Sequence, residues 1–108
     1  IFVSIHANAI SMSRPEVNGL ETYYLSSGLR LAEVIHQTIL EDHPTIRDRR
    51  VKKARFYVLR HTSMPSILLE TGFVTGAQDA ARLRDPGHRS RLASSIAKGI
   101  LRYLGRSN

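Results

Sequence analysis

Apolar residues occur along this chain in short runs at strand spacing and in longer stretches at helix spacing. Residues 1–5 form an apolar, partly β-branched run that predicts a buried strand. Further strands are predicted at residues 20–25, 56–59 and 66–70. The last of these runs is apolar at consecutive positions, which is typical of a parallel strand covered on both faces. The pattern therefore predicts four strands.

Two long amphipathic helices are predicted between and after these strands. In the first, apolar residues recur at helical spacing up to about Asp42, and Ser26 or Ser27 can cap the first turn. The second begins at Asp85 and keeps the i, i+3, i+4 period of apolar residues. Gly105 follows it, and glycine is typical of helix C-terminal ends.

A short third helix is predicted from capping chemistry. Thr75 and Gln78 match a capping box, in which the hydroxyl and the amide side chain satisfy each other's free backbone N–H groups. The helix is expected to end near Arg84. It would connect the fourth strand to the last helix.

Strands that alternate with helices indicate an α/β fold, here a three-layer arrangement with a largely parallel sheet flanked by helices. In such folds ligands bind at the carboxyl ends of the strands. His6 ends the first predicted strand and Glu70 ends the fourth. These two side chains are therefore the first candidates for chemistry.

Composition limits the remaining possibilities. The 108 residues suffice for one domain, and no apolar run approaches the ~20 residues that cross a bilayer. The chain has no cysteine, which excludes disulfides and thiolate chemistry. Its net charge of +7 favours an anionic partner, and six of its basic residues lie between Arg47 and Arg55. A solvated connection is the default interpretation of that segment.

His6 and Glu70 each allow a functional and a structural interpretation. A strand-end histidine can bind a metal ion or transfer protons, but it can equally be a hydrogen-bonded structural residue. Burial at the end of an apolar strand would raise the pKa of the Glu70 carboxyl, as a general base working near neutrality requires. The alternatives for Glu70 are an ion pair with Arg60 or a cap of the following turn. Together the two residues suggest a metal-activated water with Glu70 as proton shuttle.

Other candidates are weaker. His36, His43 and His88 fall in or beside predicted helices and are expected to be solvated surface residues. His61 follows the third predicted strand and is either a second metal ligand or a turn residue. Glu21 shares one face of the second strand with its neighbour two residues on, so it reaches either the site or solvent. Serine nucleophiles find no supporting motif.

Four segments of the sequence match motifs of a known family, and they occur in the same order as in that family. They are FVSIHAN at residues 2–8, GLETYYL at 19–25, VLR at 58–60 and PSILLETGF at 65–73. The chain resembles the zinc-dependent N-acetylmuramoyl-L-alanine amidases of bacterial cell-wall turnover and cell separation. The resemblance covers essentially the whole chain, and the SIHAN and ETGF words together are specific.

The resemblance implies roles for both candidates. His6 would be a zinc (Zn²⁺) ligand, and Glu70 the catalytic residue that hydrolyses the amide between N-acetylmuramic acid and L-alanine. The family's other two zinc ligands precede the first strand and have no counterpart here. Residues 1–108 are therefore expected to be the C-terminal part of a single amidase catalytic domain, with the N-terminal strands missing and with poor zinc binding on its own.

The resemblance also implies a partner and a location. The partner would be peptidoglycan or a muropeptide rather than nucleic acid, and the oligomeric state stays open. The location would be the periplasm, or outside the cell at the wall, with any export signal outside this chain. Two rival hypotheses remain, namely a non-catalytic basic module that binds an anionic wall polymer and another α/β metallohydrolase.

Overall fold

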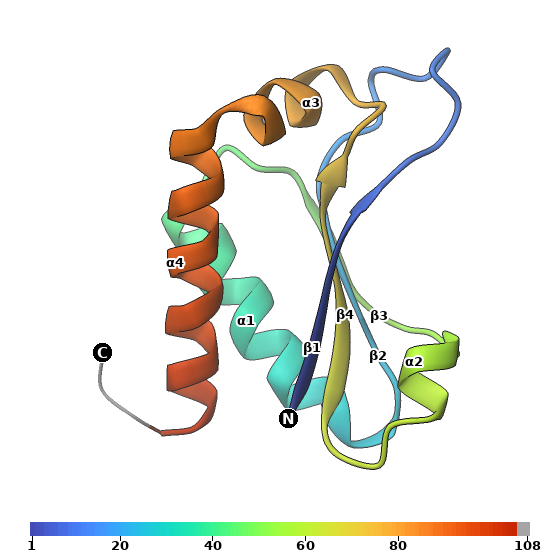
Figure 1. The fold of residues 1–108 in the computed structure, drawn as a ribbon, viewed down its shortest axis with the longest axis vertical. Coiled ribbons are helices and arrows are strands. Elements are labelled where there is room, and N and C mark those ends of the chain that lie inside the picture. Colours follow the sequence, from blue (N-terminus) through green and yellow to red (C-terminus); the bar gives the residue numbers. More distant parts are fainter. Residues whose placement is uncertain (106–108) are drawn as a thin grey trace.

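The computed structural model describes residues 1–105 and contains a four-stranded sheet with helices packed mainly on one face (Figure 1). The strands lie in the order β1-β4-β2-β3. They are β1 (Phe2–Asn8), β2 (Leu20–Tyr24), β3 (Asp48–Lys53) and β4 (Ser66–Phe73). The helices are the 3₁₀ turn η1 (Ser26–Gly28), α1 (Leu29–Asp42), α2 (Tyr57–Arg60), α3 (Ala77–Arg84) and α4 (Pro86–Tyr103).

The sheet is mixed in direction. β1 is parallel to β4 and β2 is parallel to β3, whereas β2 and β4 are antiparallel. Parallel strands need a long crossover, usually a helix, and α1 supplies one between β2 and β3. The segment between β1 and β2 contains no helix, and the chain reverses its direction there. The predicted α/β class with a largely parallel sheet is confirmed, since two of the three strand pairings are parallel.

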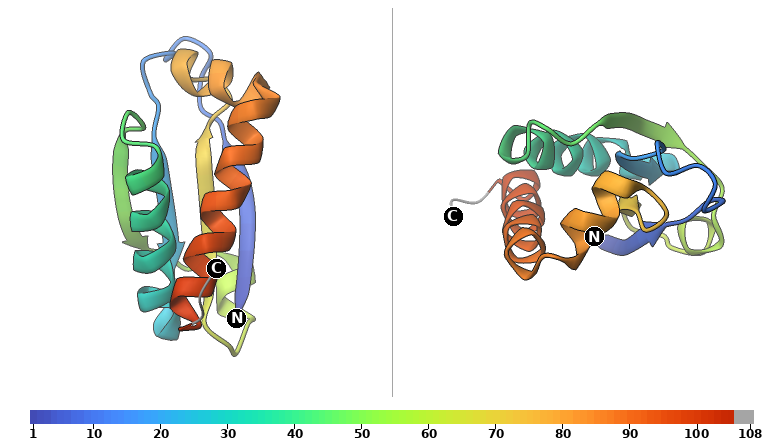
Figure 2. Two further views of the ribbon diagram at one scale, coloured as in Figure 1. Left: turned by 90° about the vertical axis from the view of Figure 1, so that its left-hand side faces the viewer. Right: turned by 90° about the horizontal axis from the view of Figure 1, so that it is seen from above.

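Helices α1 and α4 pack against each other and cover one face of the sheet, as both views of Figure 2 show. Large aliphatic side chains fill the space between them and the strands, and each stabilises the fold by about 1.5–3 kcal/mol when fully buried. These side chains include Leu20, Leu31, Ile35, Ile39, Ile67, Leu69, Leu92 and Ile96. The short α2 lies toward the opposite face, at one end (Figure 1). None of the helices formed by residues 1–105 has the length and apolar character to cross a lipid bilayer.

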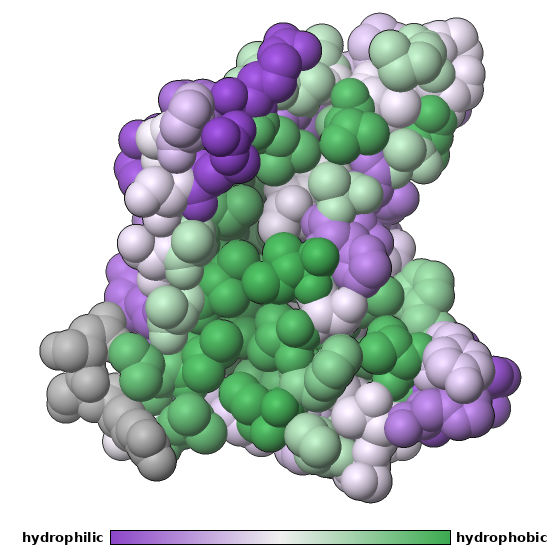
Figure 3. Space-filling model, in the orientation of Figure 1, coloured by the Kyte–Doolittle hydropathy of each residue, from purple (hydrophilic) through white to green (hydrophobic). Residues whose placement is uncertain are grey.

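β1 is the one predicted strand whose burial is wrong. It lies at the edge of the sheet, and none of its residues is buried. The Ile5 side chain is 56% exposed because α4 packs against α1 rather than over β1. Figure 3 shows apolar side chains gathering on this side of the molecule, where β1 and α4 face the viewer.

The third predicted strand is displaced along the chain. Residues 56–59 contain the beginning of helix α2, and the strand is β3, inside the basic segment expected to be a solvated connection. The expectation of a solvated connection is wrong because of the place of β3 at the edge of the sheet. An edge strand tolerates charged side chains on its solvent side, and Val51 alone packs against the core from the middle of β3.

The predicted start of the last helix at Asp85 is confirmed, whereas the two predicted side-chain caps are wrong. Asp85 caps α4, accepting a hydrogen bond from the backbone N–H of residue 87. No side chain caps α1, which follows Gly28, so the predicted serine cap is wrong. The predicted capping box is also wrong, because the Thr75 hydroxyl accepts a hydrogen bond from the Ile10 N–H at 3.1 Å instead. Thr75 thus holds the loop after β1 rather than the start of α3.

Candidate active site

Three titratable side chains form a row across the middle of the sheet. In the parallel pairing of β1 with β4, His6 lies directly opposite Glu70. In the antiparallel pairing of β2 with β4, Glu21 lies opposite the same Glu70. Residues opposite each other on neighbouring strands project from the same face. His6, Glu70 and Glu21 therefore share one face of the sheet, the face away from α1 and α4.

His6 ends the regular part of β1. The register of β1 against β4 shifts between His6 and Asn8, so the strand is irregular directly after the imidazole. The Ser4 hydroxyl lies 2.6 Å from His6 Nε2 on the same face of the strand. In the part of the chain that the structure describes, Nδ1 of His6 has no hydrogen-bond partner, and the ring is exposed. The imidazole is thus oriented by one contact and open on its other nitrogen.

Glu70 is half-buried in the middle of the row. Its Oε2 atom is buried and has no hydrogen-bond partner among residues 1–105. Burial raises the pKa of the Glu70 carboxyl; the nearby His6 opposes this shift, and the negative charge of Glu21 adds to it. Neither structural alternative is found in this range, since no ion pair joins Glu70 to Arg60 and Glu70 caps no helix. A carboxyl with a raised pKa and a free oxygen is suited to accept and return a proton near neutral pH.

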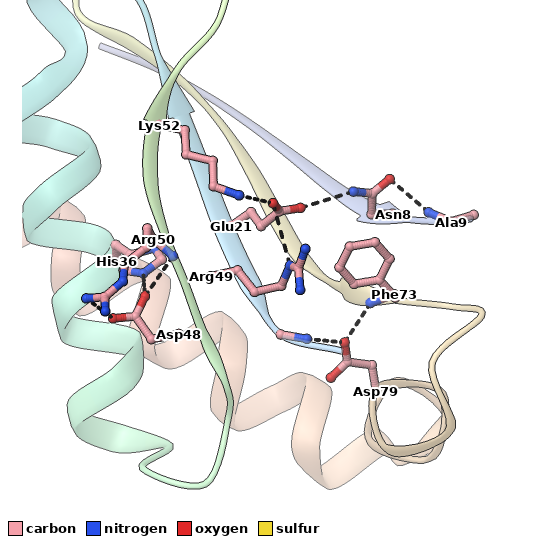
Figure 4. A network of polar contacts seen from close by, with 11 residues as sticks. Asn8, Ala9, Glu21, His36, Asp48, Arg49, Arg50, Lys52, Phe73 and Asp79 are labelled. Carbon is pink, nitrogen blue, oxygen red and sulfur yellow. Dashed lines mark hydrogen bonds and ion pairs between the residues drawn. The ribbon is translucent and has the colours of Figure 1, made fainter. Parts of the chain in front are cut away.

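Glu21 is the most deeply buried member of the row, with 4% of its surface exposed. Its Oε1 accepts a hydrogen bond from Asn8 Nδ2 at 3.3 Å, and its Oε2 accepts one from Lys52 Nζ at 2.6 Å (Figure 4). Arg49 Nε lies 3.6 Å from the same Oε2. Burial by itself would raise the pKa of Glu21, but the contact with Lys52 and the charge of Arg49 lower it overall. Glu21 is therefore held as a carboxylate beside Glu70.

Sequence reasoning missed Arg49 and Lys52 because it placed them in a solvated connection. A bulge in β3 explains their position, since Leu20 pairs with Asp48 but Thr22 pairs with Val51, leaving an additional residue in β3. That additional residue is Arg50, whose φ of 81° lies in the left-handed region. The isolated valine at position 51 was the available signal of a strand here.

The bulge changes which side chains share a face. In a regular strand residues 49 and 51 would project together. With one residue inserted, Val51 faces the core while Arg49 and Lys52 both face Glu21. Two basic side chains are therefore placed on the site face from an edge strand.

His36 is a buried residue rather than the expected surface histidine, with 5% of its surface exposed. Its Nδ1 lies 2.8 Å from the Thr22 hydroxyl and its Nε2 lies 2.8 Å from Asp48 Oδ1. Asp48 also accepts a hydrogen bond from the backbone N–H of Arg50 at 2.8 Å. His36 thus connects α1 and β2 to the bulge of β3, on the helix side of the sheet.

The remaining histidines lie away from the row. His88 at the start of α4 is 6% exposed, so it is not the expected surface residue, and its ring contacts that of His43 edge-to-face at 5.3 Å. Burial lowers the pKa of His88, and the neighbouring His43 lowers it further. His61 follows α2 and packs against Tyr57 with 4.2 Å between ring centroids. It occupies a turn, as one of the two sequence interpretations had it.

Asp79 fixes the ends of the two central strands. Its carboxylate is 3% exposed and accepts hydrogen bonds from the Gly19 N–H at 2.7 Å and the Phe73 N–H at 2.8 Å. These backbone groups lie at the start of β2 and the end of β4 (Figure 4). The register of Glu21 against Glu70 is held from this end of the sheet.

The side chains of the row could form only part of a metal site. Residues 1–105 contain no group of three or more His, Asp and Glu side chains arranged to hold a metal ion. His6 is the one imidazole of the row, with an open nitrogen, and the carboxylates of Glu70 and Glu21 lie next to it in register. A single ligand from this chain, completed by donors from elsewhere, is what these residues fit.

A cavity of about 620 Å³ lies elsewhere, between α1 and β3. It is lined by His36, Asp48 and exposed residues of α1, and none of the row residues borders it. It opens on the helix side of the sheet. The face that carries His6, Glu70 and Glu21 is instead an open surface of the strands.

Comparison with known proteins finds consistent relatives. The profile of a family described as N-acetylmuramoyl-L-alanine amidase matches residues 1–102. N-acetylmuramoyl-L-alanine amidase LytC of Bacillus subtilis (strain 168) is 43% identical over 108 residues, which cover 95% of this chain and 21% of that protein.

Solved structures agree. N-acetylmuramoyl-L-alanine amidase AmiC2 of Nostoc punctiforme is 56% identical with a TM-score of 0.94, over 97% of this chain and 58% of that one. The catalytic domain of the amidase CwlV from Bacillus (Paenibacillus) polymyxa var. colistinus is 39% identical with a TM-score of 0.86, over 98% of this chain and 58% of that domain. The chain thus spans about a fifth of one curated relative and somewhat more than half of these solved structures.

Proposed function

Since the chain belongs to the N-acetylmuramoyl-L-alanine amidase family, we propose that the protein containing it hydrolyses the amide between N-acetylmuramic acid and L-alanine in peptidoglycan. The observation that carries this proposal is the register of the sheet. It sets His6 and Glu70 opposite each other on the open face. The family relationship supplies the reaction, and the row supplies residues able to perform it.

Glu70 is the proposed general base and acid. Its free, buried oxygen and the raised pKa of its carboxyl support this role. Glu70 takes a proton from the attacking water as the new bond from oxygen to the carbonyl carbon forms. It then gives that proton to the alanine nitrogen as the carbon–nitrogen bond breaks. The products are a muramic acid carboxyl group and a peptide with a free amino end, and such proton transfer contributes roughly 10²- to 10⁴-fold.

His6 is the proposed zinc ligand of this chain. Its open ring nitrogen and its position opposite Glu70 support this role. Zinc bound there would supply Lewis acidity toward the amide carbonyl and the water. Ser4 orients the imidazole ring, and Glu21 keeps a negative charge beside Glu70 that favours its protonated form after the proton is taken.

The proposed substrate also defines partner and place. Peptidoglycan or its muropeptide fragments are the partner, and nucleic acid is not. Cell-wall hydrolysis places the protein in the periplasm or at the wall outside the cell. The names of relatives such as the probable cell wall amidase LytH of Staphylococcus aureus, 30% identical over 104 residues, support a wall location.

The substitution Glu70→Gln in the full-length natural protein tests the base. It removes the proton acceptor but keeps size and polarity, so we expect turnover of a purified muropeptide to fall at least 10²-fold. Mass spectrometry should detect release of intact stem peptide by the wild type only. Undiminished release by the Gln variant would remove Glu70 from this role. Binding of wall polymer without any release by the folded wild type would favour the basic-module hypothesis.

The substitution His6→Ala tests the ligand. We expect the zinc content of the purified full-length protein to fall, because one donor is lost. Elemental analysis measures this, and His61→Ala is the matched control since His61 lies outside the row. Unchanged zinc stoichiometry in the His6 variant would reject His6 as a ligand.

A further inference from the structure

Arg49 has an unused capacity for hydrogen bonding on the site face. Its guanidinium lies between the Glu21 carboxylate and the Phe73 ring, 5.2 Å from the ring centroid (Figure 4). Nε is buried and has no hydrogen-bond partner within the described range 1–105, and the whole side chain is 29% exposed. A guanidinium that is held by stacking and has free N–H groups is preorganised to receive an acceptor.

Two cations lie close to the Glu21 carboxylate, and they contact it differently. Glu21 faces two cations, Lys52 at 2.6 Å and Arg49 at 3.6 Å. Lys52 makes the short hydrogen bond, while the contact with Arg49 is too long to be one. Glu21 is therefore paired with Lys52, whereas the guanidinium of Arg49 has no hydrogen-bond acceptor among residues 1–105.

The fold places Arg49 here at a conformational cost. The bulge of β3 puts Arg50 in the left-handed region, which is unfavourable for a residue with a side chain. Asp48 stabilises that conformation by accepting the Arg50 N–H, and His36 holds Asp48 in turn. Without the bulge, Arg49 and Lys52 would not share a face. The anchored bulge indicates that the position of Arg49 is specified rather than incidental.

The spacing of the strands sets the distance between Arg49 and an amide held at Glu70. Neighbouring strands lie about 4.8 Å apart, so β3 lies roughly 10 Å from β4, with β2 between them. The bulge brings Arg49 level with Glu21, which is itself level with Glu70. An extended peptide spans about 3.5 Å per residue. A group bound by Arg49 would thus lie within about three residues of an amide held at Glu70.

We propose that Arg49 binds a carboxylate on the peptide side of the scissile amide and thereby selects acidic peptides as substrates. This inference rests on the proposed amidase function and adds the substrate class. A planar guanidinium pairs with a carboxylate through two parallel hydrogen bonds, and such pairing distinguishes a carboxylate from a neutral amide. Glu21 and Phe73 hold the guanidinium in place for this contact.

Two substrates test the proposal in the zinc-loaded, full-length natural protein. Both are N-acetylmuramoyl-L-alanyl dipeptides, one ending in a carboxylate and the other in a carboxamide. We expect the wild type to favour the carboxylate by about 10- to 100-fold in kcat/KM. In Arg49→Gln the carboxylate substrate should lose this advantage, so that the ratio of kcat/KM between the two substrates falls toward one, and Arg49→Lys should restore part of the ratio. Arg30→Gln, which removes an exposed charge from α1, should keep the wild-type ratio.

A second readout needs no turnover. Calorimetry measures how tightly the same two N-acetylmuramoyl-L-alanyl dipeptides bind to the metal-free protein. The carboxylate form should bind more tightly than the carboxamide form to the wild type and equally to Arg49→Gln. If Arg49→Gln lowers kcat/KM equally for both substrates, Arg49 only supports the structure. If the ratio of kcat/KM between the substrates equals that of the wild type, Arg49 contacts no carboxylate. Either result overturns the proposal. If the folded, zinc-loaded wild type cleaves neither substrate, the amidase function fails, and the binding measurement still decides the role of Arg49.

Discussion

At the scale of single residues, the fold depends on polar side chains that connect elements across the sheet. Asp48 is one of them, since it accepts hydrogen bonds from the ring of His36 and from the backbone of the bulge in β3. Burial acts to raise the pKa of Asp48, but these hydrogen bonds and the charge of Arg50 outweigh it, and the pKa lies below the ordinary value of 3.8. The ionised form of Asp48 is therefore favoured by folding.

This shift predicts a pH dependence of stability. A carboxyl whose pKa is depressed by folding contributes stability above its unfolded value, and the contribution is lost as pH falls through the folded value. We expect the free energy of unfolding of Asp48→Asn to lie below that of the wild type at pH 7. The difference should shrink below about pH 3.8. Urea unfolding between pH 2.5 and pH 7 measures this; a difference that grows toward acid would contradict it.

At the scale of elements, close backbone contacts decide how the helices meet the sheet. Gly28, the last residue of η1, lies so near to β4 that an added Cβ would be 2.2 Å from the Ser66 carbonyl oxygen. Its φ of −83° is ordinary, so the constraint is one of space alone. The entry of the chain into α1 thus requires a residue without a side chain.

Substitution of Gly28 by Ala should destabilise the protein by about 1–3 kcal/mol or more, because backbone must move to relieve the overlap. Gly87→Ala is the matched control, since its Cβ would lie 3.1 Å from the flexible end of the Arg91 side chain and in ordinary van der Waals contact with the Asp85 carboxylate at 3.5 Å. Thermal unfolding followed by circular dichroism compares the two variants. Equal melting temperatures for Gly28→Ala and the wild type would show that this contact relaxes freely.

The helices and strands differ in how far their positions could be predicted from the sequence. The periods of α1 and α4 were predictable because each helix buries one continuous apolar stripe, including Ile35 and Ile96. β3 and α2 were exchanged in the prediction because β3 lies at the edge and carries charge, while residues 57–60 have the β-branched and aromatic character of a strand but form one helical turn. The preference of single residues for helix or strand does not determine the secondary structure of a segment that is short or that contacts the core with one side chain.

The candidate site was predictable in part for similar reasons. A carboxylate directly after three apolar positions identified Glu70, and a strand end predicted at His6 identified that residue, although β1 continues to Asn8 and β4 to Phe73. The surroundings of Glu21 depend on strand order and on one inserted residue in β3, neither of which leaves a periodic signal. The burial of His36 depends on a partner twelve positions away in another element.

At the scale of the whole molecule, the sheet has an uncovered apolar border. β1 forms one edge of the sheet, and Ile5 in its middle is 56% exposed. Exposed edge strands with apolar side chains are templates for pairing with other chains. The 108-residue chain, expressed by itself, should therefore associate as its concentration rises.

The substitution Ile5→Lys tests this expectation, since a charge on an edge strand opposes pairing. Light scattering between micromolar and millimolar concentrations should detect association of the wild-type chain and less of it for the variant. Tyr57→Lys is the matched control, because Tyr57 is 74% exposed but belongs to α2 rather than to the edge. Equal association of all three chains would place the contact elsewhere.

The bulge of β3 lies on a border strand, outside the tightly packed interior between the helices and the central strands. Exchanging the side chain at position 49 thus requires no repacking of that interior. With the role proposed for Arg49, related proteins could differ in the peptides they accept through this one position and still keep His6, Glu70 and Glu21.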